Sequence, residues 1–171
     1  EQNVFVPKNI SVPFIETFNT IPDWSIINPD QNYTRDLANT PEGGTNTAMK
    51  MEFFNYEDHL GELDLLITPA FDLTDAPAAL LKFDVAYARF QSSDDGLKVV
   101  LLSDCGLDIS SGIVVYDKAG ATLATTSSTT SDFVPANDQW RKEAVDLSAY
   151  IGQANLQLAF VGFNDWGNNL Y

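Results

Sequence analysis

Apolar and polar residues alternate along much of this chain, whereas the repeat of apolar positions that marks a helix is scarce. Alternation with a period of two is typical of β-strands that bury one face. The segment LKFDVAY (residues 81–87) is the clearest case, because its odd positions are apolar and its first two even positions are charged. This pattern, together with short apolar runs between turn residues, predicts eight strands: residues 13–18, 48–54, 62–68, 79–89, 97–103, 112–116, 139–147 and 155–163.

The segments between these strands are long and irregular. Residues 22–44 are rich in Pro, Asn and Gly, which is typical of a connection that carries function or wraps the edge of a sandwich. Residues 122–132 are mostly Ser and Thr, and we expect a mobile or edge-strand segment there. Many short strands with such connections predict an all-β fold, a two-sheet antiparallel β-sandwich of the jelly-roll type.

The chain shows no internal repeat and no linker that would divide it. We therefore expect one jelly-roll domain over residues 1–171, with residues 1–11 as an N-terminal extension or linker. The final segment, GNNLY (residues 167–171), predicts a turn followed by the first two residues of another strand. Because strands usually run for about five or six residues, we expect this last strand to be truncated at the C-terminus.

The net negative charge of the chain excludes some classes of function. The 171 residues contain 24 Asp and Glu against 9 Lys and Arg, a formal net charge of −15, and a phosphate backbone would be repelled by such a chain. We therefore expect no nucleic-acid partner. Apolar stretches are far shorter than the roughly 20 residues of a membrane helix, so we expect no membrane insertion. A hydrophobic content of 44% is nonetheless too high for a disordered chain.

The single His and the single Cys exclude several kinds of site. An intrachain disulfide is impossible, and zinc sites built from several His or Cys residues cannot form. A catalytic triad would have to use His59, which lies in a loop where a surface position is the usual role, and no G-x-S-x-G motif is present. Cys105 follows a strand without a visible basic partner, which favours a structural role. We therefore expect no enzyme, although paired carboxylates could form a glycoside hydrolase.

Carboxylates are the abundant reactive groups, and they suggest calcium. They gather in residues 57–64, 94–95 and 104–108, and Ca²⁺ takes six to eight oxygen ligands from such loops. A solvated acidic surface is the alternative, and no EF-hand spacing is present. Glu16 favours the metal, because it lies in the apolar run PFIETF, where a buried carboxylate needs a partner. The predicted ligands of a structural Ca²⁺ are Glu16, Asn46, Asp58 and Asp95.

Aromatic residues in the connections predict a ligand-binding surface. An exposed ring on a loop can stack on a sugar or clamp a peptide. Trp24 and Trp140 are expected to plug the ends of the sandwich, whereas Trp166 lies in the polar turn NDWGNN. The predicted ligand-binding residues are Trp166, Tyr56 and Tyr33.

Eight segments, in order, resemble a known family. They are PFIETF (13–18), DLLITPAFDL (64–73), LKFDVAY (81–87), DGLKV (95–99), SDCG (103–106), YDKAG with LAT (116–125), WR with VDLSAY (140–150) and GNNLY (167–171). This series resembles the choice-of-anchor J and cleaved-adhesin type domains, which are MAM-like jelly rolls of secreted Bacteroidetes proteins. Two departures are the stop at Tyr171, before the closing Asp of the family's L-Y-I-D strand, and the absence of a Trp soon after Cys105.

The resemblance implies a non-catalytic, calcium-stabilised binding or adhesion module of an exported bacterial multidomain protein. It implies a location outside the cell or at the cell surface, export by type IX secretion, and Glu16 as a metal ligand. The implied partners are a surface polysaccharide or a protein, together with other domains or subunits of a larger secreted assembly. The alternatives are a carbohydrate-active enzyme domain that uses paired carboxylates and a structural spacer without a ligand.

Overall fold

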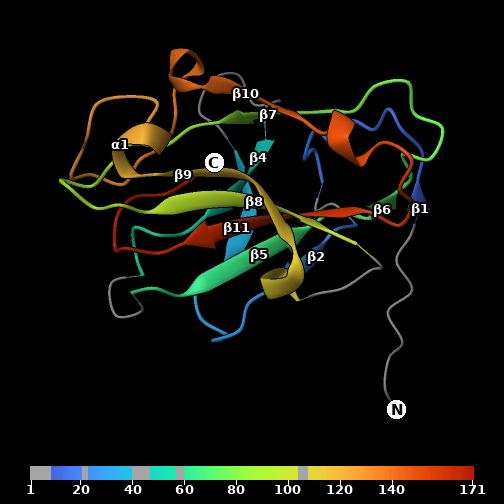
Figure 1. The fold of residues 1–171 in the computed structure, drawn as a ribbon. Coiled ribbons are helices and arrows are strands. Elements are labelled where there is room, and N and C mark those ends of the chain that lie inside the picture. Colours follow the sequence, from blue (N-terminus) through green and yellow to red (C-terminus); the bar gives the residue numbers. More distant parts are fainter. Residues whose placement is uncertain (1–8, 21–22, 40–46, 57–59, 104–107) are drawn as a thin grey trace.

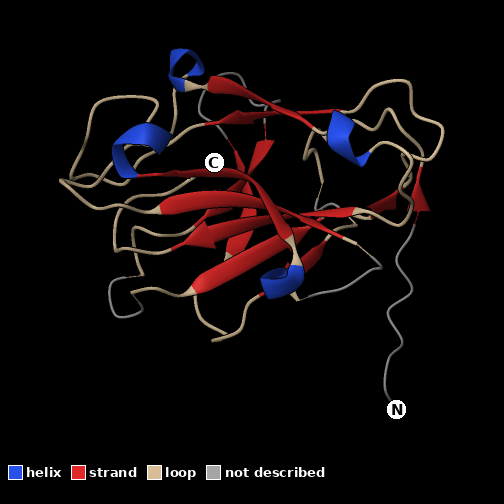
Figure 2. Ribbon diagram, viewed as in Figure 1, coloured by secondary structure: helices blue, strands red, loops and turns tan. Residues whose placement is uncertain are grey.

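The computed structural model describes residues 9–20, 23–39, 47–56, 60–103 and 108–171 (Figure 1). This part of the chain is nearly all β, with one four-residue helix, α1 (Gly120–Leu123), and short 3₁₀ helices over Ile109–Ser111, Asn137–Gln139 and Ser148–Tyr150 (Figure 2). The strands are β1 (Asn9–Ile10), β2 (Ser25–Ile27), β3 (Arg35–Asn39), β4 (Thr47–Met51), β5 (Leu63–Ile67), β6 (Ala70–Phe71), β7 (Leu80–Val85), β8 (Gly96–Leu102), β9 (Ile113–Ala119), β10 (Arg141–Asp146) and β11 (Gln157–Phe163).

One layer is an antiparallel sheet of five strands in the order β2-β5-β11-β8-β9. In Figure 1 it crosses the middle of the molecule, with β7 and β10 above it. The central strands are apolar on both faces, which is why β11 reads as an almost continuous apolar run. Their inner face packs in the main core, and their outer face forms a second cluster with Ile109 against it.

The other layer consists of two antiparallel pairs, β3 with β4 and β10 with β7. Leu170 links the two pairs, because it forms antiparallel bridges to Met51 on one side and to Tyr87 on the other. The alternation read from residues 81–87 is present here: Phe83 and Val85 face the core, whereas Lys82 and Asp84 are exposed. The parallel pair β1–β6 lies beside these layers.

The predicted two-sheet antiparallel sandwich is confirmed, and seven of the eight predicted strands correspond to strands of the structure. The strand predicted over residues 13–18 is wrong, since these residues have no strand partner and Ile15 is 82% exposed. The side chain of Glu16 accepts the backbone N–H groups of Thr17 and Phe18, at 2.8 and 2.7 Å, which a sheet would otherwise use. Phe18 also has a φ of 52°, outside the extended region.

Two strands within residues 22–44 were not predicted from the sequence. There β2 and β3 form where a wholly irregular connection was predicted. Residues 122–132, expected to be a mobile or edge-strand segment, contain no strand. The domain limits predicted from the sequence stay a prediction, although Asn9–Ile10, within the expected extension, pairs with β6.

Candidate functional site

Four loops meet at one end of the sandwich because of the register of three strands. The last residue of β11, Phe163, lies opposite Leu63, which begins β5, and opposite Gly96, which begins β8. The loop after β11 therefore lies beside the loops that precede β5 and β8, and the loop after β2 reaches the same end, since Ile27 pairs with Leu65. We call residues 28–34, 52–56, 86–95 and 164–169 the loop end.

A buried carboxylate organises the loop end. Asp95 is fully buried, and its Oδ1 accepts the backbone N–H of Asp165 at 2.8 Å. Its Oδ2 accepts the hydroxyl of Tyr87 at 2.7 Å and the backbone N–H of Asn168 at 3.0 Å. Burial raises the pKa of Asp95, and these hydrogen bonds oppose the rise. Gly167 is required here, because a Cβ on it would lie 1.5 Å from Asp95 Oδ2.

Three buried asparagines join the same loop to its neighbours. Asn164 donates to the carbonyl of Tyr56 at 2.7 Å and accepts the N–H of Trp166 at 3.0 Å. The amide oxygen of Asn168 accepts the N–H of Phe133 at 2.8 Å. Asn169 accepts the N–H of Phe54 at 3.1 Å, and all three asparagine residues are 0% exposed. The loop that carries Trp166 is therefore held by its own buried side chains.

A row of aromatic rings lies on this support. Trp166 is 43% exposed, and its ring lies 5.8 Å from that of Phe90, which lies 6.1 Å from that of Phe54. Trp166 has a φ of 46°, an uncommon conformation for a bulky residue that the hydrogen bond from its N–H to Asn164 helps to hold. We call Trp166, Phe90 and Phe54 the aromatic row.

The other two predicted ligand-binding residues form a pair nearby. Tyr33 is 47% exposed, and its ring packs edge-on against Tyr56 at 6.1 Å. Tyr56 is only 1% exposed, and its hydroxyl donates to the carboxylate of Asp30. Of the three predicted aromatic contacts, Trp166 and Tyr33 thus face solvent, whereas Tyr56 supports Tyr33 from beneath.

A second buried carboxylate lies next to the loop end, on β5. Asp64 is 1% exposed, and among the described residues neither of its oxygens accepts a hydrogen bond of regular geometry, although the Thr34 side chain lies close enough to lower its pKa. Burial raises its pKa to about 6, and the nearby charge of Arg35 opposes this rise. Burial also lowers the pKa of Arg35 to about 10, and the Asp64 charge opposes that change. Gly162 lies opposite Asp64 in the β5–β11 ladder and leaves room for the guanidinium of Arg35. A Cβ on Gly162 would lie 3.2 Å from Nη2 of Arg35.

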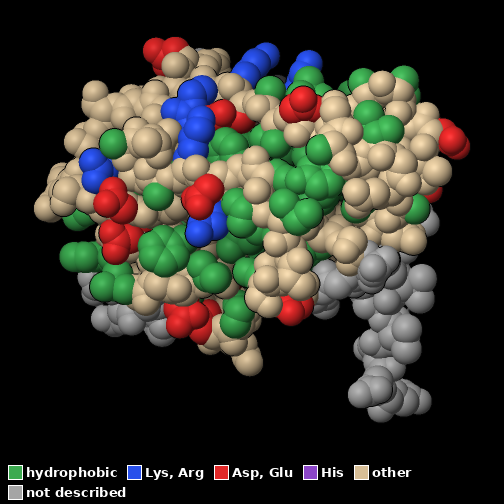
Figure 3. Space-filling model, in the orientation of Figure 1, with side chains coloured by type: hydrophobic (Ala, Val, Ile, Leu, Met, Phe, Trp, Pro, Cys, Tyr) green, Lys and Arg blue, Asp and Glu red, His purple; other side chains and the backbone are tan. Residues whose placement is uncertain are grey.

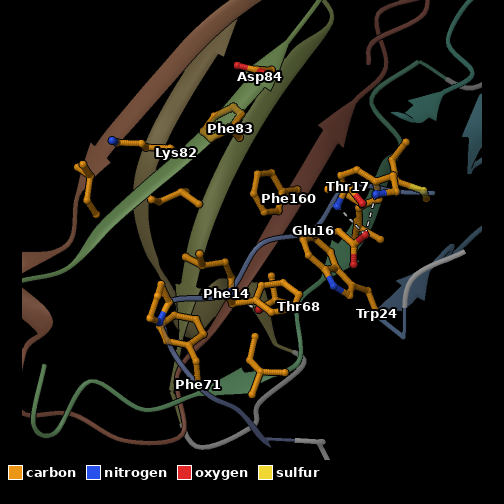
Figure 4. Close-up of a pocket in the computed structure, with 18 of the residues that line it drawn as sticks. Phe14, Glu16, Thr17, Trp24, Thr68, Phe71, Lys82, Phe83, Asp84 and Phe160 are labelled. Atoms are coloured by element: carbon orange, nitrogen blue, oxygen red, sulfur yellow. Dashed lines mark hydrogen bonds between the residues drawn. The ribbon is translucent and has the colours of Figure 1, made fainter. Parts of the chain in front are cut away.

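Glu16, the first predicted calcium ligand, lies at the other end of β5, beside a cavity of about 1450 Å³. Figure 4 shows it next to Trp24, with Phe160 at the floor of the cavity and β7 on the far side. Trp24 stacks on Phe160 with ring centroids 6.1 Å apart, so it lines this cavity. The two backbone N–H groups on Oε1 fix the direction of the Glu16 carboxylate.

The structure does not bring the four predicted calcium ligands together. Glu16 and Asp95 lie at opposite ends of the sandwich, and Asn46 and Asp58 lie outside the described residues. Within the part of the chain that the structure describes, no three His, Cys, Asp or Glu side chains are grouped to hold a metal ion. Acidic side chains on the face in Figure 3 are scattered around a central apolar area. The calcium site stays a prediction.

The sequence missed most of the residues that build the loop end. Asn164, Gly167, Asn168 and Asn169 look like ordinary turn residues, although each is buried. Arg35, within a connection predicted to be irregular, gave no sign of its burial against Asp64. The one available signal was the density of Asn and Gly in the segment NDWGNN, which favours a tightly hydrogen-bonded turn.

Comparison with known proteins identifies the fold. No protein-family model matches the chain, and no curated protein matches its sequence. Among solved structures, it is similar to cleaved adhesin domains of Lys-gingipain. The K1 domain from Porphyromonas gingivalis W83 is 23% identical, with 91% of this chain and 90% of that chain covered and a TM-score of 0.64.

Two further domains of Lys-gingipain agree with this match. The K2 domain is 20% identical over 92% of each chain, with a TM-score of 0.62. The K3 domain from the same organism is 20% identical over 91% of each chain, with a TM-score of 0.61. At these identities the likeness shows a shared β-sandwich fold, so the predicted resemblance to cleaved adhesins is confirmed for the fold. The choice-of-anchor J resemblance stays a prediction. No helix in the described ranges has the length and apolar character to cross a membrane.

Proposed function

We propose that this chain is a non-catalytic binding module that holds a glycan or a protein ligand through the aromatic row at its loop end. The observation that carries this proposal is Trp166, an exposed indole on a loop that is fixed from within by Asn164, Gly167 and Asn168. A rigid aromatic side chain contributes a large contact area at a low entropic cost when it binds.

The support beneath the row is more extensive than a solvent-exposed turn needs. Asp95 is buried with three donors on its carboxylate, and Trp166 keeps an uncommon backbone conformation. Uncommon backbone conformations persist where the surrounding structure imposes them, and they cluster at functional sites. The row therefore combines exposure with preorganisation, which a binding surface requires.

The fold supports the rest of the proposal. The three similar structures are called cleaved adhesin domains, and their parent is Lys-gingipain. By analogy, we propose that this module belongs to an exported bacterial protein that works at the cell surface or beside a secreted enzyme. Surface polysaccharides, surface proteins and other parts of a larger secreted assembly are the proposed partners.

An array of glycans and bacterial and host surface proteins tests the binding function. We expect the purified chain to retain at least one ligand and to release no reducing ends from the polysaccharides on the array. Catalysis abolished by a single Asp→Asn change would instead assign a carbohydrate-active enzyme. A blank array together with a blank pull-down from culture supernatant would favour the ligand-free spacer.

We further propose that Ca²⁺ stabilises the module, with Glu16 among its ligands. An ion that binds only the folded chain raises its stability by mass action, and 1 mM Ca²⁺ at a Kd of about 10 μM corresponds to roughly 3 kcal/mol. For a chain of this size we expect the Tm to rise by about 5–10 °C in calcium and to fall again in chelator. Differential scanning calorimetry measures this shift.

A matched pair of variants locates the ion. Glu16→Gln removes the charge without changing the shape of the side chain, and we expect it to abolish most of the shift. Asp117→Asn, at an exposed carboxylate of β9 outside the lining of the cavity beside Glu16, is expected to leave the shift unchanged. A wild-type Tm that is the same in calcium, magnesium and chelator would contradict the calcium proposal.

A further inference from the structure

The loop end carries an excess of carboxylates around the aromatic row. Its four segments contain one basic residue, Arg89, and five carboxylates, which are Asp30, Glu52, Asp94, Asp95 and Asp165. The guanidinium of Arg89 donates to the backbone carbonyls of Ser92 and Ser93, at 2.7 and 2.9 Å. It also donates to the Asp94 carboxylate at 2.7 Å, so its charge is already balanced within its own loop. A ligand that approaches the aromatic row therefore meets a negative surface.

Two of these carboxylates lie at the Trp166 end of the row. Asp165 directly precedes Trp166, and its Oδ2 accepts the backbone N–H of Asp94 at 2.8 Å. The side chain of Asp94 is 65% exposed, and its ion pair with Arg89 lies at the surface. Because exposed ion pairs contribute little free energy, Asp94 can accept a second cation without a large loss. The indole of Trp166 is thus exposed beside two carboxylates.

A further carboxylate lies at the Phe54 end of the row. The amide oxygen of Asn169 accepts the N–H of Phe54 at 3.1 Å, and its amide nitrogen donates to Asp132 Oδ1 at 2.6 Å. Asp132 is exposed. The ring centroids from Trp166 to Phe54 are separated by steps of 5.8 and 6.1 Å through the ring of Phe90. Carboxylates therefore flank both ends of a short strip of rings.

Hydrogen-bond donors are scarce on this strip. The side chains of Asn164, Asn168 and Asn169 are buried and bonded within the protein, so they are not presented to the hydroxyl groups of a sugar. Ionised carboxylates only accept hydrogen bonds. The ligand that complements flat rings and acceptors is a flat cation rich in donors. The guanidinium of arginine has five N–H donors and no acceptor, stacks on aromatic faces and bonds carboxylates in pairs.

We propose that the aromatic row binds an extended, arginine-bearing segment of a protein partner, with one guanidinium stacked on Trp166 and bonded to the carboxylates of Asp94 and Asp165. This inference rests on the proposed binding function and narrows the ligand from a glycan or a protein to a basic protein segment. Arginines at alternate positions of an extended segment project from one side about 6.8 Å apart, close to the spacing of the rings.

A capped peptide with two arginines at alternate positions, Thr-Arg-Thr-Arg-Thr, is the probe. We expect it to bind the 171-residue chain with a Kd of tens to hundreds of micromolar in about 150 mM NaCl, where long-range attraction between exposed charges is largely screened. The peptide with lysine in both positions carries the same charge and is expected to bind at least fivefold more weakly, because an ammonium is more strongly hydrated and does not stack. Isothermal titration calorimetry measures both affinities.

Replacing both arginines by citrulline tests the charge without altering the protein. Citrulline has nearly the shape of arginine but is neutral, and we expect its peptide to bind at least tenfold more weakly. The arginine peptide is also expected to lose at least tenfold in affinity between about 50 and about 500 mM NaCl, because exposed charge pairs are screened by salt. The small affinity of the citrulline peptide is expected to change less than twofold over the same range.

Two variants place the peptide on the row. Asp165→Asn removes a charge and keeps an oxygen for the N–H of Asp94, and we expect it to weaken the arginine peptide at least fivefold. Trp166→Ala is expected to weaken it at least tenfold. Asp75→Asn, at an exposed carboxylate that lines the cavity at the opposite end of β5, is expected to leave the affinity within twofold. Circular dichroism shows whether each variant is folded, and the citrulline comparison covers a variant that is not.

Three outcomes would overturn the inference. One is the absence of binding by the arginine peptide at millimolar concentration, and another is equal binding by the arginine and citrulline peptides. The third is a glycan from the array whose affinity is lost in Trp166→Ala but is insensitive to salt and to Asp165→Asn. That third result would leave the proposed binding function of the row intact, whereas a chain that retains neither an array ligand nor the peptide would contradict both.

Discussion

Replacing Asp95 by Ala is expected to lower the free energy of unfolding by about 3–5 kcal/mol, the largest effect of any single substitution considered for this chain. The carboxylate accepts from the hydroxyl of Tyr87 and from the backbone N–H groups of Asp165 and Asn168. The hydrogen bonds from Tyr87 and Asn168 are buried and that from Asp165 is partly buried, while Asp95 itself is 0% exposed. A buried donor without an acceptor has lost its hydrogen bonds to water and forms none in the protein, so each unpaired donor lowers the free energy of unfolding further.

Urea unfolding followed by circular dichroism measures the loss, and the adjacent residue supplies the control. Asp94 makes an exposed ion pair with Arg89 at 2.7 Å, and its own side chain is 65% exposed. Asp94→Ala is therefore expected to cost less than about 1 kcal/mol. Equal, small effects of Asp95→Ala and Asp94→Ala would contradict the role assigned to the buried network.

The second large effect concerns Asp64 and has a defined dependence on pH. Burial raises the pKa of Asp64 to about 6 in the folded chain, whereas an unfolded Asp titrates near 4. Above pH 6 Asp64 is therefore ionised in the folded chain, where its charge has a higher free energy than in the unfolded chain. This lowers the free energy of unfolding. The difference corresponds to roughly 3 kcal/mol, and the cost disappears as the pH falls below about 4.

Asp64→Asn removes this charge while keeping the shape of the side chain. We expect the variant to be more stable than the wild type by about 2–3 kcal/mol at pH 7.5, and this advantage to fall by about half at pH 5. Chemical unfolding at several values between these two, above the pI near 4.1, measures the trend. Asp75→Asn, at an exposed carboxylate, serves as the control, and a gain at Asp64 that is independent of pH would contradict the explanation.

Local pattern was sufficient to predict the layers of the sandwich. The alternation in residues 81–87 gave β7 with its faces correctly assigned, and the long apolar run of residues 155–163 gave a central strand buried on both faces. The prediction over residues 13–18 was wrong for a physical reason that composition does not reveal. The Glu16 side chain bonds the backbone that a strand would need, and only the folded loop shows this.

The local pattern of apolar and polar residues was much less informative for the loop end. Asp95 and Trp166 were both singled out in the sequence, yet nothing local indicates that they belong to one structure. Their relation depends on the register between β8 and β11, which places residues about seventy positions apart in contact. The burial of Arg35 against Asp64 likewise depends on pairing between distant strands, and a chain rich in acidic residues offers many equivalent candidates.

The most direct test of the account compares the ligand affinity of the wild type with that of Trp166→Ala. Phe14→Ala is the matched control, since Phe14 is 41% exposed, close to the 43% of Trp166, and lines the cavity at the opposite end of β5. We predict that Trp166→Ala weakens binding of the ligand found on the array by at least tenfold without changing the Tm, and that Phe14→Ala leaves the affinity within twofold. Unchanged affinity in Trp166→Ala, or a loss confined to Phe14→Ala, would contradict the proposal that the aromatic row binds the ligand.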